Sequence, residues 1–395
     1  MKYCVLIIDG AAGLPLSERG GKTCLELAHT PNLDAMADEG ILGIARTVPL
    51  GMEPSSGNAC LAVLGYDPEV HHRGRAAIEA RNMGVSIGEG EAAFRCSLVT
   101  VVDGKLMDYS SGHISTEESR QLIAVLNEKL GNDYIHFYLG VSYRHICKIR
   151  GRDDILLATC TQPTDIRGKS IDEFLPTGPG SELLRDLILR SAAVLRDHPV
   201  NIKRRARGDN PANRIWLFWS SGPVPDLPAF KQVYGLSAAM TSSVDVLRGL
   251  AQMMGMTNLD IPGVTDGLDN DFTAQAAGAL AALQEHDLVA IHIEAADEAG
   301  HAGLIDDKIE AIQMVDREII SQLYSWRGDS FRVLVMPDHP TPVKLYTHND
   351  EPVPFMLWGA GFTANGARRF TESEAAKTGL FIDSGYNIMS QLIRG

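Results

Sequence analysis

Carboxylates and histidines gather where several apolar runs of this chain end. Asp9 directly follows YCVLII, a short continuous run rich in β-branched residues, as is typical of a buried parallel strand. Five more follow other apolar runs: Asp297, His301, Asp338, His339 and His348. Because the carboxyl ends of parallel strands meet at one edge of a sheet, we expect these six side chains to converge there. Three carboxylates and three imidazoles suit two borderline divalent ions such as Mn²⁺ or Zn²⁺ better than Ca²⁺, which prefers oxygen ligands.

Taken singly, each of these residues also fits an ordinary structural role. Asp297 and His301 lie four apart, so on a helix they share one face and can bind one ion. The same pair also fits a helix start with Asp297 as its cap and His301 on the surface. Asp338 and His339 stand between prolines, where both can reach one metal from a turn. The metal interpretation therefore rests on the set of six and not on any member.

The stretch EPSSGNACLAVLGYDP places two serines, Ser55 and Ser56, directly before an apolar run. Read locally, it is a helix start with two candidate capping residues. Two divalent ions ~4 Å apart would clamp the attacking and leaving oxygens of a phosphoryl transfer and lower the pKa of a coordinated hydroxyl. With such ions nearby, one of these serines becomes a candidate nucleophile.

The elements that must position these residues alternate between strand and helix. Strands are predicted at 3–8, 286–294 and 331–339, with further candidates at 216–219 and 354–358. PNLDAMADEG predicts a helix with proline in its first turn and Gly40 at its end. Apolar residues spaced three and four apart predict a long helix over 305–323. This alternation indicates an α/β sheet with crossover helices.

The middle of the chain reads differently. A hairpin is predicted around Asp103-Gly104, and a helix follows whose start, Ser115 to Glu118, has the form of a capping box. We therefore expect a smaller α+β domain at 78–210, inserted into a core domain made of 1–77 and 211–395.

Composition narrows the classes of partner and compartment. The 395 residues are 45% hydrophobic, which is enough for a large core and indicates two domains. The net charge of −14 argues against non-specific binding to nucleic acid or anionic membranes. Three features predict a cytoplasmic protein. The six cysteines form no CxxC pair, the chain opens on a strand without a signal-type segment, and no run reaches ~18 apolar residues. The sequence does not indicate an oligomeric state.

With these residues assembled, the chain closely resembles the archaeal type of cofactor-independent phosphoglycerate mutases, within the alkaline phosphatase superfamily. The segments that carry the resemblance run from end to end: MKYCVLIIDGAAGLP, LGYDP, GRAAIEARNMGV, GVSYRHI, EAADEAGHAG and THNDEPVPF. The resemblance implies an alkaline-phosphatase-like three-layer sandwich with a mostly parallel sheet and an inserted α+β domain. It also implies interconversion of 2-phosphoglycerate and 3-phosphoglycerate in glycolysis and gluconeogenesis, through a phosphoserine and without 2,3-bisphosphoglycerate.

The resemblance further implies roles for individual positions. Asp297, His301 and His348 would hold one of two divalent ions (Mn, Zn, Mg or Co), and Asp9, Asp338, His339 and the nucleophile would surround the other. Ser56 matches the nucleophile, whereas Ser55 falls where the family usually carries glycine. A helix N-terminus also suits a phosphoserine, because free N–H groups point at the anion.

The inserted domain would bind the small phosphorylated substrate. Arginines are suited to this task, because they make bidentate contacts to phosphate and carboxylate. The candidates are Arg75, Arg144, Arg204, Arg205 and Arg207, with His145 and Asp165 assisting. The KRRAR run that holds three of these arginines also fits a solvated strand edge.

Three positions depart from the family pattern, all in or beside the expected substrate region. Gly57 stands where an aspartate is usual, Thr164 where histidine is common, and His113 where arginine is frequent. An alternative is therefore phosphoryl transfer to another small hydroxyl compound, as in relatives proposed to be homoserine kinases. A third is a metal-dependent phosphatase or phosphodiesterase, in which water completes the reaction. A binding protein without activity is disfavoured, because the six metal positions and Ser56 are intact.

Overall fold

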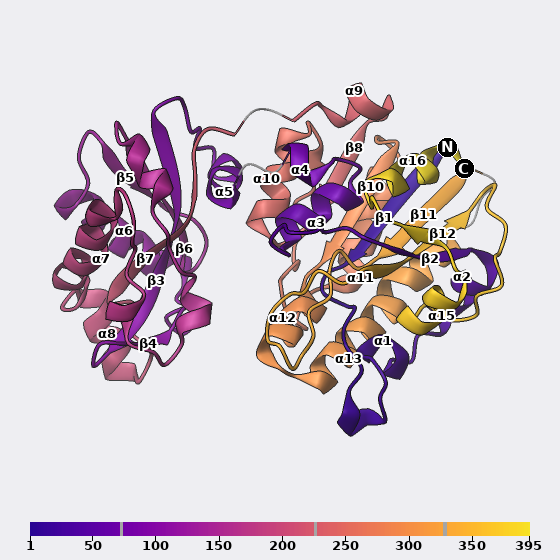
Figure 1. Cartoon of the computed structure of the whole chain (residues 1–395), viewed down its shortest axis with the longest axis horizontal. Coiled ribbons are helices and arrows are strands. Elements are labelled where there is room, and N and C mark those ends of the chain that lie inside the picture. The colour runs from indigo at the N-terminus through magenta and orange to yellow at the C-terminus, as the bar shows by residue number, and fades with distance from the viewer. Residues whose placement is uncertain (72–73, 225–226, 327–329) are drawn as a thin grey trace. The chain divides into compact units, whose positions relative to one another are not determined.

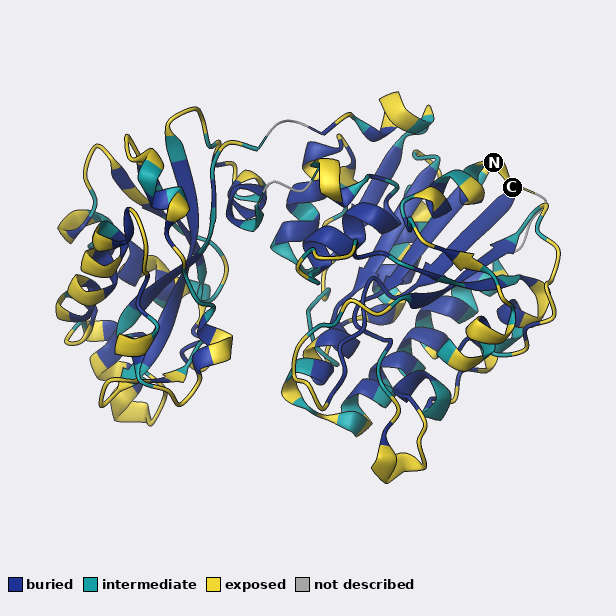
Figure 2. Cartoon of the chain, in the orientation of Figure 1, coloured by how far each residue is buried: buried dark blue, intermediate teal, exposed yellow. Residues whose placement is uncertain are grey.

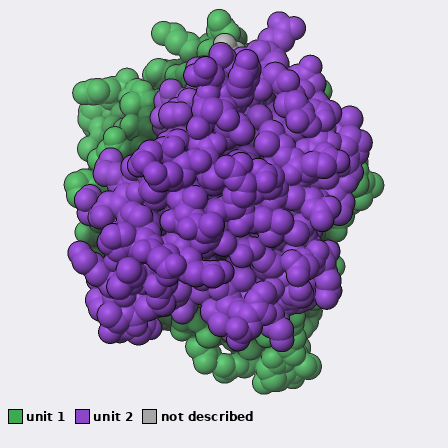
Figure 3. All heavy atoms as spheres, turned by 90° about the vertical axis from the view of Figure 1, so that its left-hand side faces the viewer, with its two compact units in different colours: residues 1–72, 226–395 green, residues 73–225 purple. Residues whose placement is uncertain are grey.

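The computed structural model describes residues 1–71, 74–224, 227–326 and 330–395. The chain divides into two compact units, which Figure 3 colours separately: unit 1 is residues 1–72 with 226–395, and unit 2 is residues 73–225. The boundaries predicted at 77/78 and 210/211 lie inside unit 2, because the helix that begins at Arg75 and the strand that ends at Ser221 both pack in that unit.

Unit 1 is built on an eight-stranded sheet in the order β13-β2-β12-β11-β1-β10-β8-β9. Only β12 runs antiparallel to its neighbours, β11 and β2, so the predicted mostly parallel sheet is confirmed. The strands are β1 Lys2–Ile8, β2 Ile41–Ala45, β8 Ala238–Thr241, β9 Thr257–Asn258, β10 Leu288–Ile293, β11 Phe331–Met336, β12 Val353–Gly359 and β13 Phe381–Ile382.

Helices cover both faces of this sheet (Figure 1), and the strands between them are dark with burial in Figure 2. Helices α3, α10 and α16 pack together on one face, while α2, α11 and the α13–α14 segment pack on the other. Their bounds are α1 Cys24–Leu27, α2 Pro31–Glu39, α3 Ser56–Val63, α4 Pro68–His71, α9 Phe230–Tyr234, α10 Asp245–Met253, α11 Phe272–Ala282, α12 Ala295–Ala302, α13 Ile305–Met314, α14 Ser321–Ser325, α15 Glu372–Lys377 and α16 Asn387–Arg394. Strand β1 lies between β10 and β11, and every residue from Tyr3 to Ile8 is buried, which explains its continuous apolar sequence.

The helix predicted over 305–323 is confirmed, with a π-helical segment at Val315–Ile320 between α13 and α14. This segment carries Asp316, whose carboxylate accepts hydrogen bonds from the backbone N–H groups of Asn32 and Leu33. These two residues belong to the first turn of α2, whose own N-cap residue, Thr30, makes no side-chain cap. Asp316 therefore supplies the cap of α2 from another part of the chain.

Unit 2 holds a five-stranded antiparallel sheet in the order β4-β3-β6-β5, with β7 paired to β3. Its strands are β3 Glu91–Val102, β4 Lys105–Asp108, β5 Ile135–Tyr138, β6 Arg144–Arg150 and β7 Arg214–Ser221, and its helices of eight residues or more are α5 Arg75–Asn82, α6 Thr116–Lys129, α7 Ser181–Leu195 and α8 Pro199–Arg207. The predicted inserted α+β architecture, the hairpin at Asp103-Gly104 and the Ser115 cap of α6 are confirmed.

In this region the predicted WLFW strand is confirmed but lies outside the core domain to which 211–395 was assigned, and one of the two interpretations of the KRRAR run is excluded. The WLFW strand, β7, pairs with β3 of unit 2 and does not extend the core sheet, because its apolar residues pack with those of β3 in a separate core that includes Trp216 and Phe94. The KRRAR run forms the end of α8, not a strand edge, and Gly208 ends that helix in the left-handed conformation. Among the described residues, no helix is long and apolar enough to cross a membrane.

Candidate metal centre

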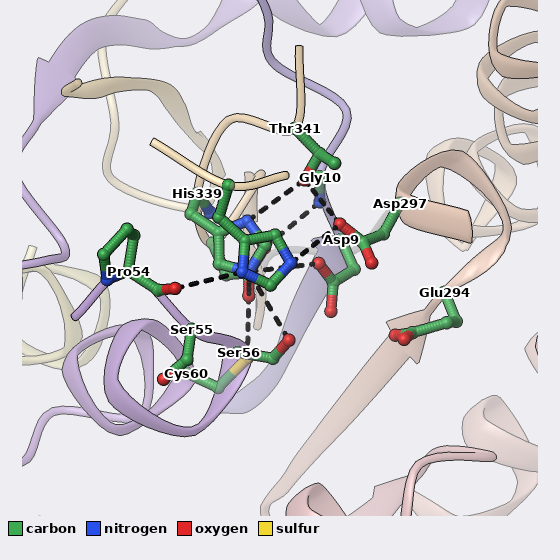
Figure 4. Close-up of polar contacts among 12 residues, drawn as sticks. Asp9, Gly10, Pro54, Ser55, Ser56, Cys60, Glu294, Asp297, His339 and Thr341 are labelled. Carbon is green, nitrogen blue, oxygen red and sulfur yellow. Dashed lines mark hydrogen bonds and ion pairs between the residues drawn. The ribbon is translucent and has the colours of Figure 1, made fainter. Parts of the chain in front are cut away.

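Three adjacent strands of unit 1 bring the predicted metal residues together (Figure 4). Asp9 follows β1, α12 with Asp297 and His301 follows β10, and Asp338 with His339 follows β11. Since β10, β1 and β11 are neighbours and parallel, their carboxyl ends deliver these side chains to one place. His348 joins them from the connection between β11 and β12.

Asp297, His301 and His348 form the first group. The Nε2 atoms of His301 and His348 are 2.8 Å apart, and they lie 3.2 Å and 3.5 Å from the Asp297 carboxylate oxygens. The Nδ1 atoms lie 3.0 Å from the carbonyl oxygens of Tyr346 and Pro54, and a carbonyl only accepts, so each Nδ1 carries the hydrogen. In the neutral rings both Nε2 lone pairs then face one point beside Asp297, which is the arrangement of ligands around a single cation.

Asp9, Asp338 and His339 form the second group, and all three side chains are fully buried. His339 Nε2 lies 3.4 Å from Asp338 Oδ2, 3.7 Å from Asp9 Oδ1 and 3.4 Å from Ser56 Oγ. Asp338 Oδ1 accepts from the backbone N–H groups of Gly10 and His339, which fixes the orientation of its carboxylate. Asp9 Oδ1 has no hydrogen-bond partner, although a buried carboxylate oxygen is costly to leave unpaired. The second group thus also fits a cation.

The two groups differ in their electrostatics. Burial, reinforced by Asp338, raises the pKa of Asp9 well above its usual range, and burial lowers the pKa of His339 to about 4. Burial also opposes a charge on His301, but the Asp297 carboxylate outweighs it and raises the pKa of this imidazole to about 9. A proton held in the first group therefore occupies the place that a divalent ion would take.

The two serines of the opening motif have different positions. Ser55 is the N-cap of α3, and its Oγ accepts a hydrogen bond of 3.4 Å from the Asn58 N–H. Ser56 is the first residue of the helix, is nearly fully buried, and lies beside His339 of the second group (Figure 4). Ser56 is thus the serine in contact with the candidate metal centre.

Thr341, which the sequence interpretation missed, connects the two groups. Its hydroxyl donates to Asp297 Oδ1 and lies 3.3 Å from His339 Nδ1. Packing around it is tight: a Cβ on Gly10, whose φ is +61°, would lie 2.6 Å from both Asp297 Oδ1 and Thr341 Oγ1. Only glycine fits the turn after β1 at this point.

His292 and Glu294 were also missed. Both lie at the end of β10, and with Asp9 they form a further buried cluster of possible metal ligands. The signal available in the sequence was weak: a histidine and a glutamate that alternate with isoleucine in a strand read as apolar. A polar residue in a strand buried on both faces is nevertheless unusual enough to be noticed.

The predicted substrate-binding residues of unit 2 lie at different places. Arg75, on α5, stacks its guanidinium on Trp219 at 3.9 Å and pairs with the buried Glu79 at 2.9 Å. Arg144 is half-buried at the start of β6, next to the fully buried His145. Asp165 is exposed in the short helix Pro163–Ile166.

The remaining arginines lie on α8 and are engaged within unit 2. Arg204 is buried and donates to the Glu118 carboxylate and to the carbonyl oxygens of Ser111 and Asn210. Arg207 pairs with Glu118 at 2.8 Å, and Arg205 donates to a backbone carbonyl. Helix α8 contacts α6, whereas α5 contacts β3 near Arg95. The structure therefore does not gather these arginines with Arg75 into one cluster.

A mostly parallel α/β sheet whose carboxyl edge assembles two carboxylate–imidazole groups beside a buried serine defines an enzyme class that uses metal ions. Comparison with known proteins identifies the family. The family model described as 2,3-bisphosphoglycerate-independent phosphoglycerate mutase matches residues 37–201. Curated proteins of that name from Methanosarcina barkeri and Methanothrix thermoacetophila are each 42% identical to this chain, with 100% of both chains covered. The chain belongs to the 2,3-bisphosphoglycerate-independent phosphoglycerate mutase family.

Solved structures agree with this assignment. A protein from Pyrococcus horikoshii has a TM-score of 0.80 at 27% identity, covering 99% of this chain and 96% of its own. The cofactor-independent phosphoglycerate mutase from Thermoplasma acidophilum has a TM-score of 0.62 at 25% identity, covering 100% and 99%. The resemblance inferred from the sequence motifs is therefore confirmed over the whole chain.

Proposed function

We propose that this protein interconverts 2-phosphoglycerate and 3-phosphoglycerate through a phosphoserine at Ser56. Membership of the family supports the reaction. The observation that carries the assignment of the nucleophile is the position of Ser56, at the N-terminus of α3 and 3.4 Å from His339 Nε2. There the hydroxyl adjoins the second group, and the free N–H groups of the first helical turn can donate hydrogen bonds to the phosphoryl oxygens.

Two divalent ions complete this site in the proposal. Asp297, His301 and His348 would hold one, and Asp9, Asp338 and His339 with Ser56 would hold the other. When bound, the ions lower the pKa of the serine hydroxyl and stabilise negative charge on the transferring phosphoryl group. The mixed carboxylate and imidazole ligands favour Mn²⁺, Co²⁺ or Zn²⁺ over Mg²⁺, which binds mainly through carboxylates and water.

The chain's own residues divide the reaction into two halves. Ser56 Oγ bonds to phosphorus as the bond to one glycerate oxygen breaks, and the freed glycerate hydroxyl takes up a proton. After the glycerate reorients, its other hydroxyl recovers the phosphoryl group and Ser56 regains its proton. Water must be excluded meanwhile, because it would hydrolyse the phosphoserine; the burial of Ser56 and the second group serves this purpose.

Unit 2 supplies substrate recognition in this proposal, and unit 1 holds the metal ions. Arg75 is the leading candidate, since Glu79 and Trp219 fix the plane of a guanidinium that can bind phosphate or carboxylate in bidentate fashion. Arg144, with His145 and Asp165 assisting, is the next. Arg204 is less suited, because its N–H groups are already bonded within the fold.

Gly57 favours two alternative functions, transfer to another small hydroxyl compound and transfer to water. This residue is buried in the first turn of α3, directly after Ser56, and supplies no side chain where the family usually has a carboxylate. A proton acceptor expected beside the nucleophile is therefore missing, which changes the chemistry available to the second half of the reaction.

An assay of the metal-supplemented protein with 3-phosphoglycerate, following 2-phosphoglycerate and free phosphate together, distinguishes these functions. Isomerisation without phosphate release supports the mutase, and phosphate release alone supports a hydrolase. No turnover with either readout contradicts both and directs the search to other acceptors. Ser56→Ala should abolish turnover, whereas Ser55→Ala, which removes only the helix cap, should keep most of it. Full activity of Ser56→Ala would contradict the nucleophile assignment.

A further inference from the structure

A third cluster of ligand-type side chains lies on the other side of Asp9 from the second group. Asp9 Oδ2 is 2.8 Å from His292 Nε2, which in turn is 3.7 Å from Glu294 Oε2. One ligand atom from each residue lies within 4.8 Å of the others, and all three residues are buried. Ligand atoms bound at ~2.1 Å to one ion lie roughly 3–3.5 Å from each other, so these spacings fit a single cation.

One carboxylate oxygen of each acid in this cluster, Asp9 Oδ1 and Glu294 Oε2, has no hydrogen-bond partner. Glu294 Oε2 has no hydrogen bond, its side chain is 10% exposed, and Figure 4 shows its carboxylate directed toward Asp9. In the described part of the chain, the ion pairs of Asp9 and Glu294 go only to His292 and His339. Two buried carboxylates without a lysine or arginine require another source of positive charge or protons.

The second nitrogen of His292 indicates which source this is. His292 Nδ1 lies 3.0 Å from Ser242 Oγ, which also accepts the Val244 N–H at 3.0 Å. If Nδ1–H donates to Ser242, the Nε2 lone pair faces Asp9 and Glu294, which is how a metal-binding histidine is held by its outer neighbour. The opposite tautomer donates Nε2–H to Asp9 but leaves Glu294 Oε2 unpaired. A cation at the centre would contact all three side chains at once.

We propose that Asp9, His292 and Glu294 bind a third divalent cation, which shares Asp9 with the second group. Two carboxylates and one imidazole fit Mn²⁺ or Zn²⁺ better than Ca²⁺. The site goes beyond the two ions proposed for phosphoryl transfer: it does not contact Ser56, and its role is to hold the Asp9 carboxylate and offset its charge. It does not depend on which substrate the enzyme uses.

Counting bound Mn²⁺ tests this site. The full chain is stripped with a chelator, dialysed against Mn²⁺ alone, and its bound metal measured per chain by mass spectrometry. Glu294→Gln should bind one Mn²⁺ fewer than the wild type. The control, Glu298→Gln, changes an exposed acid four residues further along and should bind as many. An equal count in Glu294→Gln and the wild type overturns the proposal, whatever the outcome of the mutase assay.

A second measurement covers the case in which Glu294→Gln does not fold. Wild-type crystals soaked in Mn²⁺ should show an anomalous difference peak between Asp9, His292 and Glu294. Peaks at the first and second groups without one at this position would overturn the third site and leave the two-ion proposal intact. No peak at any of the three would contradict both.

Discussion

At the scale of single residues, the Thr341 hydroxyl connects the two groups of the centre. It accepts from His339 Nδ1 and donates to Asp297, so a single buried side chain sets the orientation of a ligand in each group. Outer hydrogen bonds of this kind determine which ring nitrogen faces the metal and how a carboxylate is turned.

We expect Thr341→Val to weaken Mn²⁺ binding and activity by roughly 10–100-fold, because it preserves shape and removes both hydrogen bonds. Thr341→Ser keeps the hydroxyl and should restore most of both. Equilibrium dialysis and the mutase assay measure the two effects. If Thr341→Val binds Mn²⁺ as tightly as the wild type, the hydroxyl does not orient the ligands.

His145 should make stability depend on pH. It is fully buried and accepts the Gly140 N–H at Nδ1; burial, with neighbouring Arg95 and Arg144, lowers its pKa from 6.5 to about 3. As pH falls below 6.5, His145 therefore binds a proton in the unfolded chain but stays neutral in the native state. The free energy of unfolding decreases as a result. Between about pH 7 and about pH 5 the loss from this group is about 2 kcal/mol.

Urea unfolding of His145→Gln at both pH values checks this expectation. The variant should lose about 2 kcal/mol less than the wild type over that interval. His136→Gln, which changes an exposed histidine on β5, serves as the control and should follow the wild type. An identical pH dependence in His145→Gln would show that burial does not suppress protonation there.

At the scale of elements, the cap of α2 comes from the π-helical segment 283 residues away in sequence. We expect Asp316→Ala to destabilise unit 1 by about 1–3 kcal/mol, because it leaves donors in the first turn of α2 without an acceptor. Asp306→Ala, which removes an exposed ion pair with Arg19, should cost under ~0.5 kcal/mol. Denaturant unfolding measures both, and a neutral Asp316→Ala would mean that water replaces the cap.

The elements also show how far the sequence could be interpreted. Strands β1, β10 and β11 could be predicted because each is a continuous apolar run ending at an acid, and the neighbouring order of their ends followed from parallel-sheet rules. The sheet to which β7 belongs could not be predicted, because an apolar run does not specify which strand it will pair with. In α8, propensity and an amphipathic spacing outweighed the charge that had suggested a strand edge.

The residues of the candidate site were also predictable only in part. The six predicted ligands stand after their strands, where polar residues attract notice. His292 and Glu294 lie within or at the end of a strand, and Thr341 acts through hydrogen bonds that become visible only in three dimensions. The bonds that hold Arg204 within the fold could not be predicted either, because two of its partners, Glu118 and Ser111, lie 86 and 93 residues away in sequence.

At the scale of the whole molecule, the two units should respond differently to loss of metal. A ligand that binds only the native state stabilises it by about 2.7 kcal/mol when present at about 100 times its dissociation constant. Since the three clusters of metal-type residues found among the described residues lie in unit 1, chelation should lower the melting temperature of unit 1 and leave that of unit 2 unchanged.

Tryptophan fluorescence can follow each unit. Trp216 and Trp219 lie in unit 2, whereas Trp326 and Trp358 lie in unit 1. In a Trp326→Phe/Trp358→Phe variant, the melting curve reports unit 2 and should be the same with and without EDTA. The Trp216→Phe/Trp219→Phe variant should melt lower in EDTA. A common shift in both would mean that the units unfold as one.

The central position of β1 has a consequence for synthesis on the ribosome. This strand is made well before both of its partners, β10 and β11, which begin only at Leu288 and Phe331. Unit 2 is one continuous segment and can fold as it emerges, while the apolar β1 waits without partners until most of the chain has been translated. The nascent chain thus holds an aggregation-prone strand without its partners until β10 and β11 are made, and a chaperone that bound β1 would protect it.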